Sequence, residues 1–462
     1  MLHQRIAERS ETAVATGRLL SVNLPCPGVD LRDFLTFSRG TPRFALEQRC
    51  GGPAVAGAGI TAELVAWGDR FASIEGQTRT LFESALVDGD GPAGCHPRLF
   101  GGFAFQDDFV PDNTWTIWSP AWFVLPHYQF ALIDGESWLT LNVQVPADDN
   151  VAETLFDLRH ALQDRCHELR SHARQWSERP QARLRTLEYP MARATWDDMI
   201  STASGRIADR ELQKVVLSRV AEARFDRPPD TGLALEQLRR SYGNCWRFLL
   251  EPRPGHAFFG ATPELLADVQ GRQMKSMALA GSVARGATRD EDETLARQMM
   301  ADSKERHEHA LVAKTMNRRL ASMGETKAPE VPGVLKLANI QHLHTPLCCR
   351  LNKSGGTLSL VKLLHPSPAL GGTPRTAALK LISELEPVPR GWYAGPVGCL
   401  TMQLDGTFVV AIRSAICQER RMWLYAGAGI VAGSVAQREW EESELKFRPV
   451  LAAMGLQEGQ PD

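Results

Sequence analysis

Alternating and helical patterns of apolar residues divide the chain into strand-rich segments joined by amphipathic helices. Alternation on either side of Asp134-Gly135 and Asp405-Gly406 predicts two hairpins. Apolar residues spaced three to four apart predict helices over residues 150–176 and 290–320, and a closing helix over residues 439–451. Strands joined mostly as hairpins, with helices between them, predict an α+β fold in which large antiparallel β-sheets pack together and are covered by helices.

Residues 177–190 form a proline- and charge-rich segment that predicts a seam. Before it, no cluster of titratable residues stands out, so we expect residues 1–185 to form an N-terminal scaffold half of the same fold. Residues 190–458 carry the candidate chemistry. Thr195, with Asp198 three residues later, resembles the start signal of a helix. A chain of 462 residues can bury one continuous core.

The composition is ordinary for a soluble globular protein, with 43% hydrophobic and 23% charged residues. The formal net charge is −2 and the charges are interspersed, so we expect neither nucleic acid nor a membrane surface as a partner. No apolar run can span a bilayer, and the N-terminal residues lack the apolar core of a signal peptide. We therefore expect a cytoplasmic protein. Its nine cysteines, without Cys-x-x-Cys spacing, are expected to be reduced and mostly buried.

Two pairs of glutamates stand at helical spacing in distant parts of the chain. Glu305 and Glu308 share a face of the helix predicted over residues 290–320, and Glu439 and Glu442 are three apart in the closing helix. If these faces meet, each close pair of carboxylates repels by roughly 3–4 kcal/mol at an effective dielectric of about 20. Such a cluster calls for a divalent cation. Carboxylate ligands without paired His or Cys favour Mg²⁺ over Zn²⁺.

A solvated surface would explain the same acidic pattern. Acidic helix faces are usually exposed, and Lys304 with Glu308 makes an ordinary i,i+4 pair. The run His307-Glu308-His309 lacks the second histidine one turn later that a zinc-protease motif requires. The spacing alone therefore leaves the metal site and the solvated face both open.

Lys214 and Glu264 are two further candidates for chemistry. Lys214 begins an apolar strand; if it points inward, desolvation lowers its pKa toward the range of a general base. Glu264 follows a Thr-Pro turn in an apolar segment, where a buried carboxyl has a raised pKa and can act as a general acid. The alternatives are a lysine at the edge of a strand and a glutamate in an exposed turn.

Arg413 and two small-residue segments could bind an anion. Arg413 interrupts an apolar strand, and an inward arginine needs an anionic ligand or an internal salt bridge. LAGSVARG (279–286) and YAGAGIVAG (425–433) could cradle a carboxylate with backbone N–H groups, or simply pack closely between strands. His342 and His344 flank one residue and so face opposite sides of a strand, which argues against a shared metal.

Motifs spread over residues 190–455 resemble, in the same order, those of the chorismate-utilising enzymes. This family comprises isochorismate synthases, salicylate synthases and the synthase subunits of anthranilate and aminodeoxychorismate formation. The matching segments are KVVLSR, PELL, ALAGS, SKERHEHALV, QHLHTP, HPSPALGGTP, RGWYAGPVG, VAIRSA, YAGAGIV and EWEESELK. The first half is similar more weakly, through RLFGGFAF and PAWFVLPHYQF.

The resemblance implies a role for each matching residue. Glu308 and Glu442 would ligate Mg²⁺ directly, with Glu305 and Glu439 nearby through water, and the ion would hold the ring carboxylate of chorismate. Lys214 would activate a water molecule for attack at C2, while Glu264 protonates the departing C4 hydroxyl. Tyr393 and Arg413 would bind the enolpyruvyl carboxylate. The substrate-binding residues that the resemblance implies are Gly281, Ser282, His342, Thr345, Tyr393, Arg413, Gly427, Gly429 and Lys446.

Two positions narrow the expected reaction. Family members that use ammonia typically carry glutamine where Lys214 stands, so the lysine indicates water as the nucleophile. The aminodeoxychorismate type often has a nucleophilic lysine at the position of Ala280, and an alanine can form no covalent adduct with the substrate. The expected function is an isochorismate synthase, most similar to those of the menaquinone pathway.

Two alternatives remain. A salicylate synthase would keep Lys214 and go on to eliminate pyruvate, although Ser282 differs from the threonine common in that branch. The other is a non-catalytic chorismate-binding subunit or a glutaminase partner. Lys214, Glu264 and all four carboxylates argue against a non-catalytic protein, and nothing in the sequence marks a surface that docks a glutaminase. The partners expected are therefore small-molecule chorismate and no glutaminase, in a monomer or weak homodimer.

Overall fold

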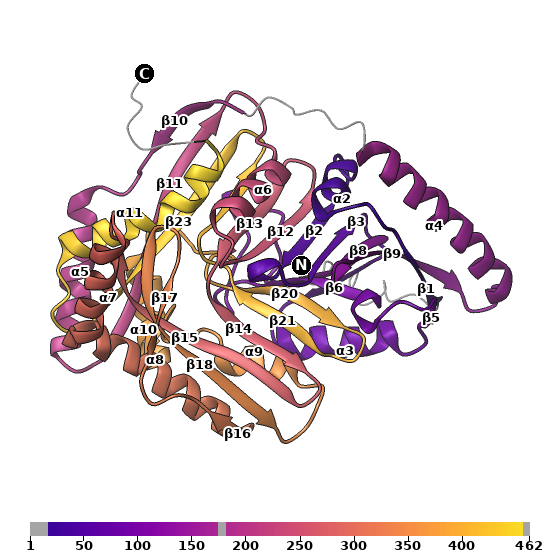
Figure 1. The fold of residues 1–462 in the computed structure, drawn as a ribbon. Helices are drawn as coiled ribbons and strands as arrows, with labels where there is room; N and C mark the ends of the chain where they lie inside the picture. The colour runs from indigo at the N-terminus through magenta and orange to yellow at the C-terminus, as the bar shows by residue number, and fades with distance from the viewer. Residues whose placement is uncertain (1–16, 174–181, 456–462) are drawn as a thin grey trace, which may run out of the picture.

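Two large β-sheets make up the centre of the molecule in the computed structural model, which describes residues 17–173 and 182–455 (Figure 1). Within these residues the larger sheet has 13 strands and is mostly antiparallel; β1 and β5 pair in parallel. Its strands, in spatial order, are β10 (Leu184–Glu188), β11 (Lys214–Phe225), β23 (Arg421–Ile430), β22 (Ser414–Gln418), β13 (His256–Thr262), β12 (Trp246–Arg253), β2 (Arg43–Glu47), β3 (Ala54–Ala58), β8 (Tyr128–Ile133), β9 (Glu136–Pro146), β1 (Gly17–Pro25) and β5 (Leu86–Asp88), with β19 (Gly372–Thr373) paired to β11.

The second sheet has ten antiparallel strands among the described residues. Their order is β16 (Gly324–Lys327), β18 (Ile340–Leu351), β15 (Gln273–Ala284), β14 (Leu265–Gln270), β21 (Gly406–Val410), β20 (Pro396–Thr401), β6 (Arg98–Phe103), β7 (Ala121–Leu125) and β4 (Ala62–Ala66), with β17 (Gly333–Lys336) paired to β18. The two predicted hairpins are confirmed as β8–β9 and β20–β21.

Helices cover the outer faces of the sheets, as the α+β prediction expects (Figure 1). Helices α5, α7, α8 and α11 gather at the end of the molecule that holds β11 and β23, whereas α4 lies at the opposite end. The helices of the described residues are α2 (Leu31–Phe37), α3 (Arg70–Phe82), α4 (Val151–Ala173), α5 (Arg193–Ala208), α6 (Thr231–Ser241), α7 (Arg289–Ala301), α8 (Ser303–Ala321), α9 (Thr357–Leu364), α10 (Arg375–Leu385) and α11 (Ala436–Ala453).

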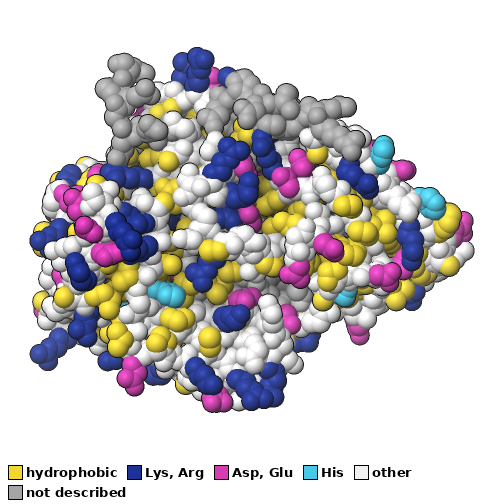
Figure 2. All heavy atoms as spheres, viewed as in Figure 1, with side chains coloured by type: hydrophobic (Ala, Val, Ile, Leu, Met, Phe, Trp, Pro, Cys, Tyr) yellow, Lys and Arg dark blue, Asp and Glu magenta, His cyan; other side chains and the backbone are white. Residues whose placement is uncertain are grey.

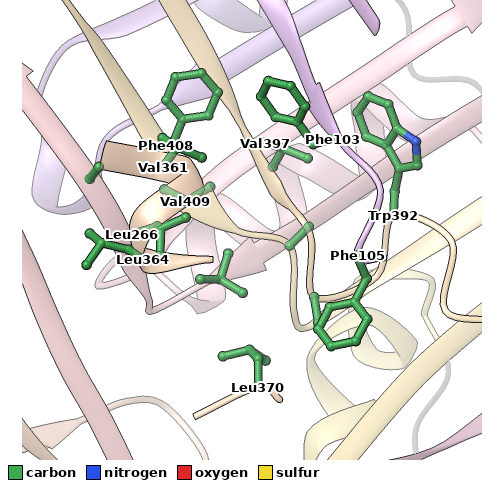
Figure 3. Close-up of a cluster of buried hydrophobic side chains, with 14 of the residues drawn as sticks. Phe103, Phe105, Leu266, Val361, Leu364, Leu370, Trp392, Val397, Phe408 and Val409 are labelled. Carbon is green, nitrogen blue, oxygen red and sulfur yellow. The ribbon is translucent and has the colours of Figure 1, made fainter. Parts of the chain in front are cut away.

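Both halves of the chain contribute to each sheet. In the larger sheet β2 pairs with β12, and in the second sheet β6 pairs with β20. Side chains from both halves also share one core, in which Phe103 of β6 lies beside Val397 of β20 and Trp392 (Figure 3). The seam predicted at residues 177–190 lies partly outside the described residues, and the division at 185–190 stays a prediction.

Two predicted helix boundaries are wrong. The helix predicted over residues 290–320 is two helices, because Asp302 is extended and its carboxylate accepts hydrogen bonds from the backbone N–H groups of Lys304 and Glu305. The helix predicted from Thr195 begins earlier, at Arg193, and its N-cap residue, Ala192, makes no side-chain hydrogen bond to the helix.

The surface and the thiols agree with the composition. Basic and acidic side chains are interspersed over the face in Figure 2. No helix among residues 17–173 and 182–455 has the length and apolar character to cross a membrane. None of the nine cysteines forms a disulfide, and seven of them are buried; Cys50 and Cys348 are exposed.

Candidate active site

A pocket lies where the two sheets meet helices α8 and α11. Strands β15 and β18 of the smaller sheet form one side, and β23 of the larger sheet faces them. The structure thereby brings together predicted residues from distant parts of the sequence. Those that line the pocket are Glu264, Gly281, Ser282, Glu308, His342, Tyr393, Arg413, Gly427, Gly429, Glu442 and Lys446.

The two predicted glutamate pairs approach each other, one on α8 and one on α11. Lys214 Nζ donates to Glu308 Oε1 at 2.8 Å, and Lys446 Nζ donates to Glu442 Oε1 at 2.6 Å. Lys214 is buried, with 1% of its side chain exposed, so the inward orientation is the correct alternative. Desolvation is the largest single influence on Glu442 and raises its pKa, but the ammonium groups of Lys446 and Lys304 act together in the opposite direction, and the net effect is a lowered pKa.

Glu305 and Glu439 form the outer part of the cluster and share one lysine. Lys304 Nζ lies 3.0 Å from Glu439 Oε1 and 3.3 Å from Glu305 Oε1. Lys304 therefore contacts these two carboxylates rather than forming the simple i,i+4 pair with Glu308. Burial raises the pKa of both, and repulsion from Glu442 raises them further. The predicted solvated face is wrong for Glu439, whose side chain is 2% exposed.

The cluster has the oxygen donors that a hard divalent ion requires, although lysines now contact them. Within the described parts of the chain, no three acidic, histidine or cysteine side chains form a ready chelating group. Besides burial, repulsion from neighbouring carboxylates raises the pKa of Glu305 and Glu439, so the cluster is electrostatically linked. The chemistry of this cluster fits Mg²⁺, provided that its carboxylates turn from their lysines toward the ion.

A bulge in β15 positions Ser282 beside this cluster. The register of β15 against β18 shifts between Ala280 and Ser282, and Gly281 between them has a φ of +75°. The bulge directs the N–H of Ser282 to Glu305 Oε2 at 3.0 Å. The sequence LAGS therefore supplies both a left-handed backbone position and a fixed donor.

Glu264 faces the same pocket as an acid that holds its proton near neutral pH. Glu264 follows β13 and is 4% exposed, and its backbone N–H donates a hydrogen bond to the hydroxyl oxygen of Thr262. Burial raises the pKa of Glu264 to about 8, and the charge of nearby Lys214 offsets this only in part. The exposed-turn alternative is thus wrong.

Arg413 is held by His342 rather than by an internal carboxylate. The Arg413 guanidinium donates from Nη2 to His342 Nε2 at 3.2 Å. Arginine can only donate, so Nε2 is the acceptor and the ring proton is on Nδ1, which lies 3.0 Å from Ser282 Oγ and 3.1 Å from Gly281 O. Burial, together with Arg413, lowers the pKa of His342 to about 3, so the imidazole is neutral.

The residue positions around Arg413 are strained in a way typical of binding sites. Arg413 itself has a φ of +50°, and Ala394, next to Tyr393, has a φ of +61°. Among the described residues, buried Arg413 donates to His342 and forms no ion pair with a carboxylate, so its charge is available to an anion in the pocket. Burial raises the pKa of Tyr393 to about 12, which keeps its hydroxyl a donor.

Gly427 and Gly429 let β23 approach the site closely. A Cβ at Gly429 would overlap Oε1 of Glu308, and one at Gly427 would lie 3.3 Å from the hydroxyl of Tyr393. The carbonyl of Gly427 also accepts from Lys446 Nζ at 2.7 Å. The sequence left two roles open for this small-residue segment, close packing between strands and a backbone lining for a ligand site. Both are present at β23.

Some residues differ from the expected set. Thr345 donates or accepts at His309 Nε2, 2.8 Å away, and is not among the described residues that line the pocket. Three further predicted residues are also absent from this lining, namely Lys214, Glu305 and Glu439. Sequence reasoning missed Tyr425, which stacks on Tyr393 with ring centroids 5.1 Å apart, and Leu370. Both lie in motifs that match the family, YAGAGIV and HPSPALGGTP, but the sequence predicted no role for either side chain.

Comparison with known protein families shows the family to which this chain belongs. A model described as "Chorismate binding enzyme" matches residues 4–455. The chain belongs to this family. The resemblance found in the motifs is therefore confirmed, and the protein is an enzyme of the chorismate-binding family with the family's α+β fold.

Several relatives in the family have curated names. "Salicylate biosynthesis isochorismate synthase" of Pseudomonas aeruginosa is 35% identical, over 86% of this chain and 82% of the relative. "Isochorismate synthase MenF" of Bacillus subtilis is 32% identical, over 78% and 75% of the two chains. The solved structure of MenF, the menaquinone-specific isochorismate synthase of Escherichia coli, has a TM-score of 0.76 at 25% identity and covers 98% of each chain.

Proposed function

We propose that this protein is a magnesium-dependent isochorismate synthase, which converts chorismate to isochorismate. The observation that carries the proposal is a buried lysine and a buried, protonated glutamic acid beside one pocket that also contains a buried arginine, which has no carboxylate partner among the described residues. An anionic substrate that undergoes addition of water and loss of hydroxyl needs this combination of charges. The names of the two curated relatives and of the MenF structure support the same product.

In the proposed reaction, Lys214 and Glu264 move protons in opposite directions. Lys214 accepts a proton from a water molecule as its oxygen forms a bond to C2 of the substrate. The ring double bonds shift, the C4–O bond breaks, and Glu264 donates its proton to the departing hydroxyl, which leaves as water. One water enters and one leaves, so the product is an isomer of the substrate. Lys214 now donates to Glu308, and must release a proton before it can act as the base.

Arg413, Tyr393 and Lys446 are proposed to position the substrate. Arg413 would pair with the enolpyruvyl carboxylate, and neutral His342 would hold the guanidinium in place without competing for that carboxylate. Tyr393 would donate its hydroxyl to the same group. Backbone groups of Gly427 and Gly429, which lack side chains, would complete this wall.

Glu308 and Glu442 are proposed to hold Mg²⁺ directly, with Glu305 and Glu439 acting through water. The ion would supply positive charge for the ring carboxylate of chorismate. Gly429 leaves room beside Glu308, since any side chain there would overlap its carboxylate. Ser282 N–H, already bound to Glu305, would keep that carboxylate oriented.

Product analysis tests the proposal. The purified protein, incubated with chorismate and Mg²⁺ without an ammonia source, is expected to form isochorismate, identified by mass spectrometry and NMR. In water enriched in ¹⁸O, isochorismate should gain one labelled oxygen, at C2. An unlabelled product would exclude addition of solvent water, and an amino product formed with ammonium would exclude Lys214 as a selector for water.

Two finer assignments are also proposals. Salicylate with pyruvate among the products would favour the salicylate synthase alternative; the relative named for salicylate biosynthesis is itself named an isochorismate synthase. We assign the product to menaquinone formation on the strength of the MenF relatives. The protein is proposed to act without a glutaminase, as a monomer or weak homodimer in the cytoplasm.

A further inference from the structure

Lys304 occupies an unusual place for a lysine on an enzyme surface helix. It is the second residue of α8, and its ammonium lies between Glu305 of its own helix and Glu439 of α11. Its side chain is 26% exposed, whereas that of Glu439 is 2% exposed. An exposed ion pair contributes little, but a buried carboxylate needs a compensating charge. Lys304 therefore serves Glu439 as its main counter-charge.

The backbone around Lys304 is fixed as well. Asp302 Oδ1 accepts from the N–H of Lys304 at 2.8 Å and from the N–H of Glu305 at 3.0 Å, which defines the first turn of α8. Glu305 is held from its other side by the N–H of Ser282. The lysine and the two carboxylates are thus pre-positioned by separate elements.

Lys304 lies on the open side of the carboxylate cluster. A second hollow is lined by Lys304, Glu305, Glu439 and Glu442, and it shares Ser282 and Glu442 with the active-site pocket. The carboxylates consequently separate two spaces. On the inner side Glu308 and Glu442 are bound by Lys214 and Lys446; on the outer side Lys304 binds the remaining two.

We propose that Lys304 is a built-in cation of the metal site, which neutralises Glu305 and Glu439 and so limits how tightly the cluster binds Mg²⁺. The inference rests on the proposed magnesium site and deepens it. Glu308 and Glu442, the proposed direct ligands, line the active-site pocket, whereas Glu305 and Glu439 line the second hollow together with Lys304. The fixed positive charge also repels the ion, which keeps its binding weak enough to be reversible.

If Lys304 had only a structural role, its removal would have a different effect on the metal affinity. Removing it would lower the melting temperature and leave the metal affinity unchanged or weaker, because disordered carboxylates chelate poorly. Under our proposal the same removal strengthens metal binding, since four carboxylates then face the ion with one positive charge fewer. The sign of the change in affinity separates the two.

The test measures Mn²⁺ and Mg²⁺ binding by electron paramagnetic resonance and calorimetry, at pH 8, without substrate. Lys304→Met is expected to lower the dissociation constant by about tenfold or more, because a unit charge within several Å of a divalent ion interacts strongly. Lys304→Arg, which keeps the charge, should bind like the wild type. Lys314→Met, at an exposed position of α8, is the matched control.

Thermal unfolding gives a second readout. In EDTA, Lys304→Met should melt at a lower temperature than the wild type, because Glu439 is left buried without its partner. Added Mg²⁺ should raise the melting temperature of Lys304→Met more than that of Lys314→Met or the wild type. An equal rise in all three proteins would contradict the proposal.

A pair of variants covers the case in which Lys304→Met does not fold. Glu439→Gln and the double variant Lys304→Met/Glu439→Gln differ only in the lysine, and the double variant leaves no buried carboxylate of Glu439 unpaired. The double variant should bind Mn²⁺ about tenfold more tightly than Glu439→Gln alone. Equal or weaker binding overturns the role of Lys304. Failure of the wild type to bind either ion, with or without chorismate, instead removes the magnesium site of the proposed function.

Discussion

Lys214 owes its special character to what surrounds it rather than to its residue type. It is the first residue of β11, is 1% exposed, and has Glu308 as its hydrogen-bond partner. Replacement by methionine keeps the shape of the side chain and removes the proton acceptor. We expect Lys214→Met to lower kcat by about 10² or more. Steady-state kinetics would measure this, with Mn²⁺ binding as the control that the metal site persists; near-normal turnover would exclude Lys214 as the base.

Glu264 should set the alkaline limit of activity. A general acid must be protonated, and the pKa of Glu264 is raised to about 8 by burial. The protonated form is present below that pH and is lost above it. We therefore expect kcat/KM to fall as the pH rises through about 8, in a profile measured at saturating Mg²⁺. Unchanged kcat/KM up to pH 10 would contradict the assignment.

The same burial makes Glu264 costly for stability. In the folded state it keeps its proton up to about pH 8, whereas in the unfolded chain it ionises near its ordinary pKa of 4.5. Unfolding thus releases a proton between these values, and the free energy of unfolding falls by up to about 1.4 kcal/mol per pH unit. Glu264→Gln should remove this loss and be more stable than the wild type at pH 7.5, but not at pH 4. Urea unfolding at the two pH values checks the difference.

Residue types and motif order predicted most of the residues at the site, but they did not show whether each side chain is buried or exposed. The sequence left Lys214 as either a surface residue or a base, because burial depends on the pairing of β11 with β23 and β19. His342 is neutral because it is buried, and the charge of Arg413, 71 residues away, lowers its pKa further. Such contacts between distant segments carry no local pattern.

At the level of elements, the sequence predicted where helices occur better than it predicted where one helix ends and the next begins. The pattern over residues 290–320 continues across Asp302, yet the chain forms α7 and α8 there. An aspartate favours a helix start because its carboxylate can accept from backbone N–H groups. The apolar spacing concealed this local signal, and the break is what directs Lys304 and Glu305 toward α11.

The cap at Asp302 can be tested separately from the carboxylates. Asp302→Ala should lower the free energy of unfolding by about 1 kcal/mol and weaken Mn²⁺ binding, because the first turn of α8 loses its fixed geometry. Thr288→Ala removes the corresponding cap of α7, at the end of that helix distant from α8. It should cost similar stability while leaving Mn²⁺ binding unchanged. Chemical denaturation and metal titration of both variants provide the comparison.

At the scale of the whole molecule, the active site is built by both sheets. Helices α8 and α11 contribute the carboxylates, β15 and β18 contribute Ser282 and His342, and β23 contributes the glycines. The chain length allowed one continuous core without predicting it, and the buried apolar side chains of the described residues form two clusters. Local patterns could not indicate that strands of the first half would complete both sheets. The pairs β2–β12 and β6–β20 join segments about 200 and 300 residues apart.

This sharing predicts that the catalytic half cannot fold alone. A fragment that begins after α4 would lose β2 beside β12 and β6 beside β20, which exposes two sheet edges and the apolar faces that Phe103 and Phe44 cover. We expect the fragment to aggregate when expressed by itself. Co-expression with the first half, cut between α4 and β10, should restore soluble protein that binds Mn²⁺. Size-exclusion chromatography and metal titration would check both outcomes, and a soluble, metal-binding fragment on its own would show that the N-terminal strands are dispensable for the site.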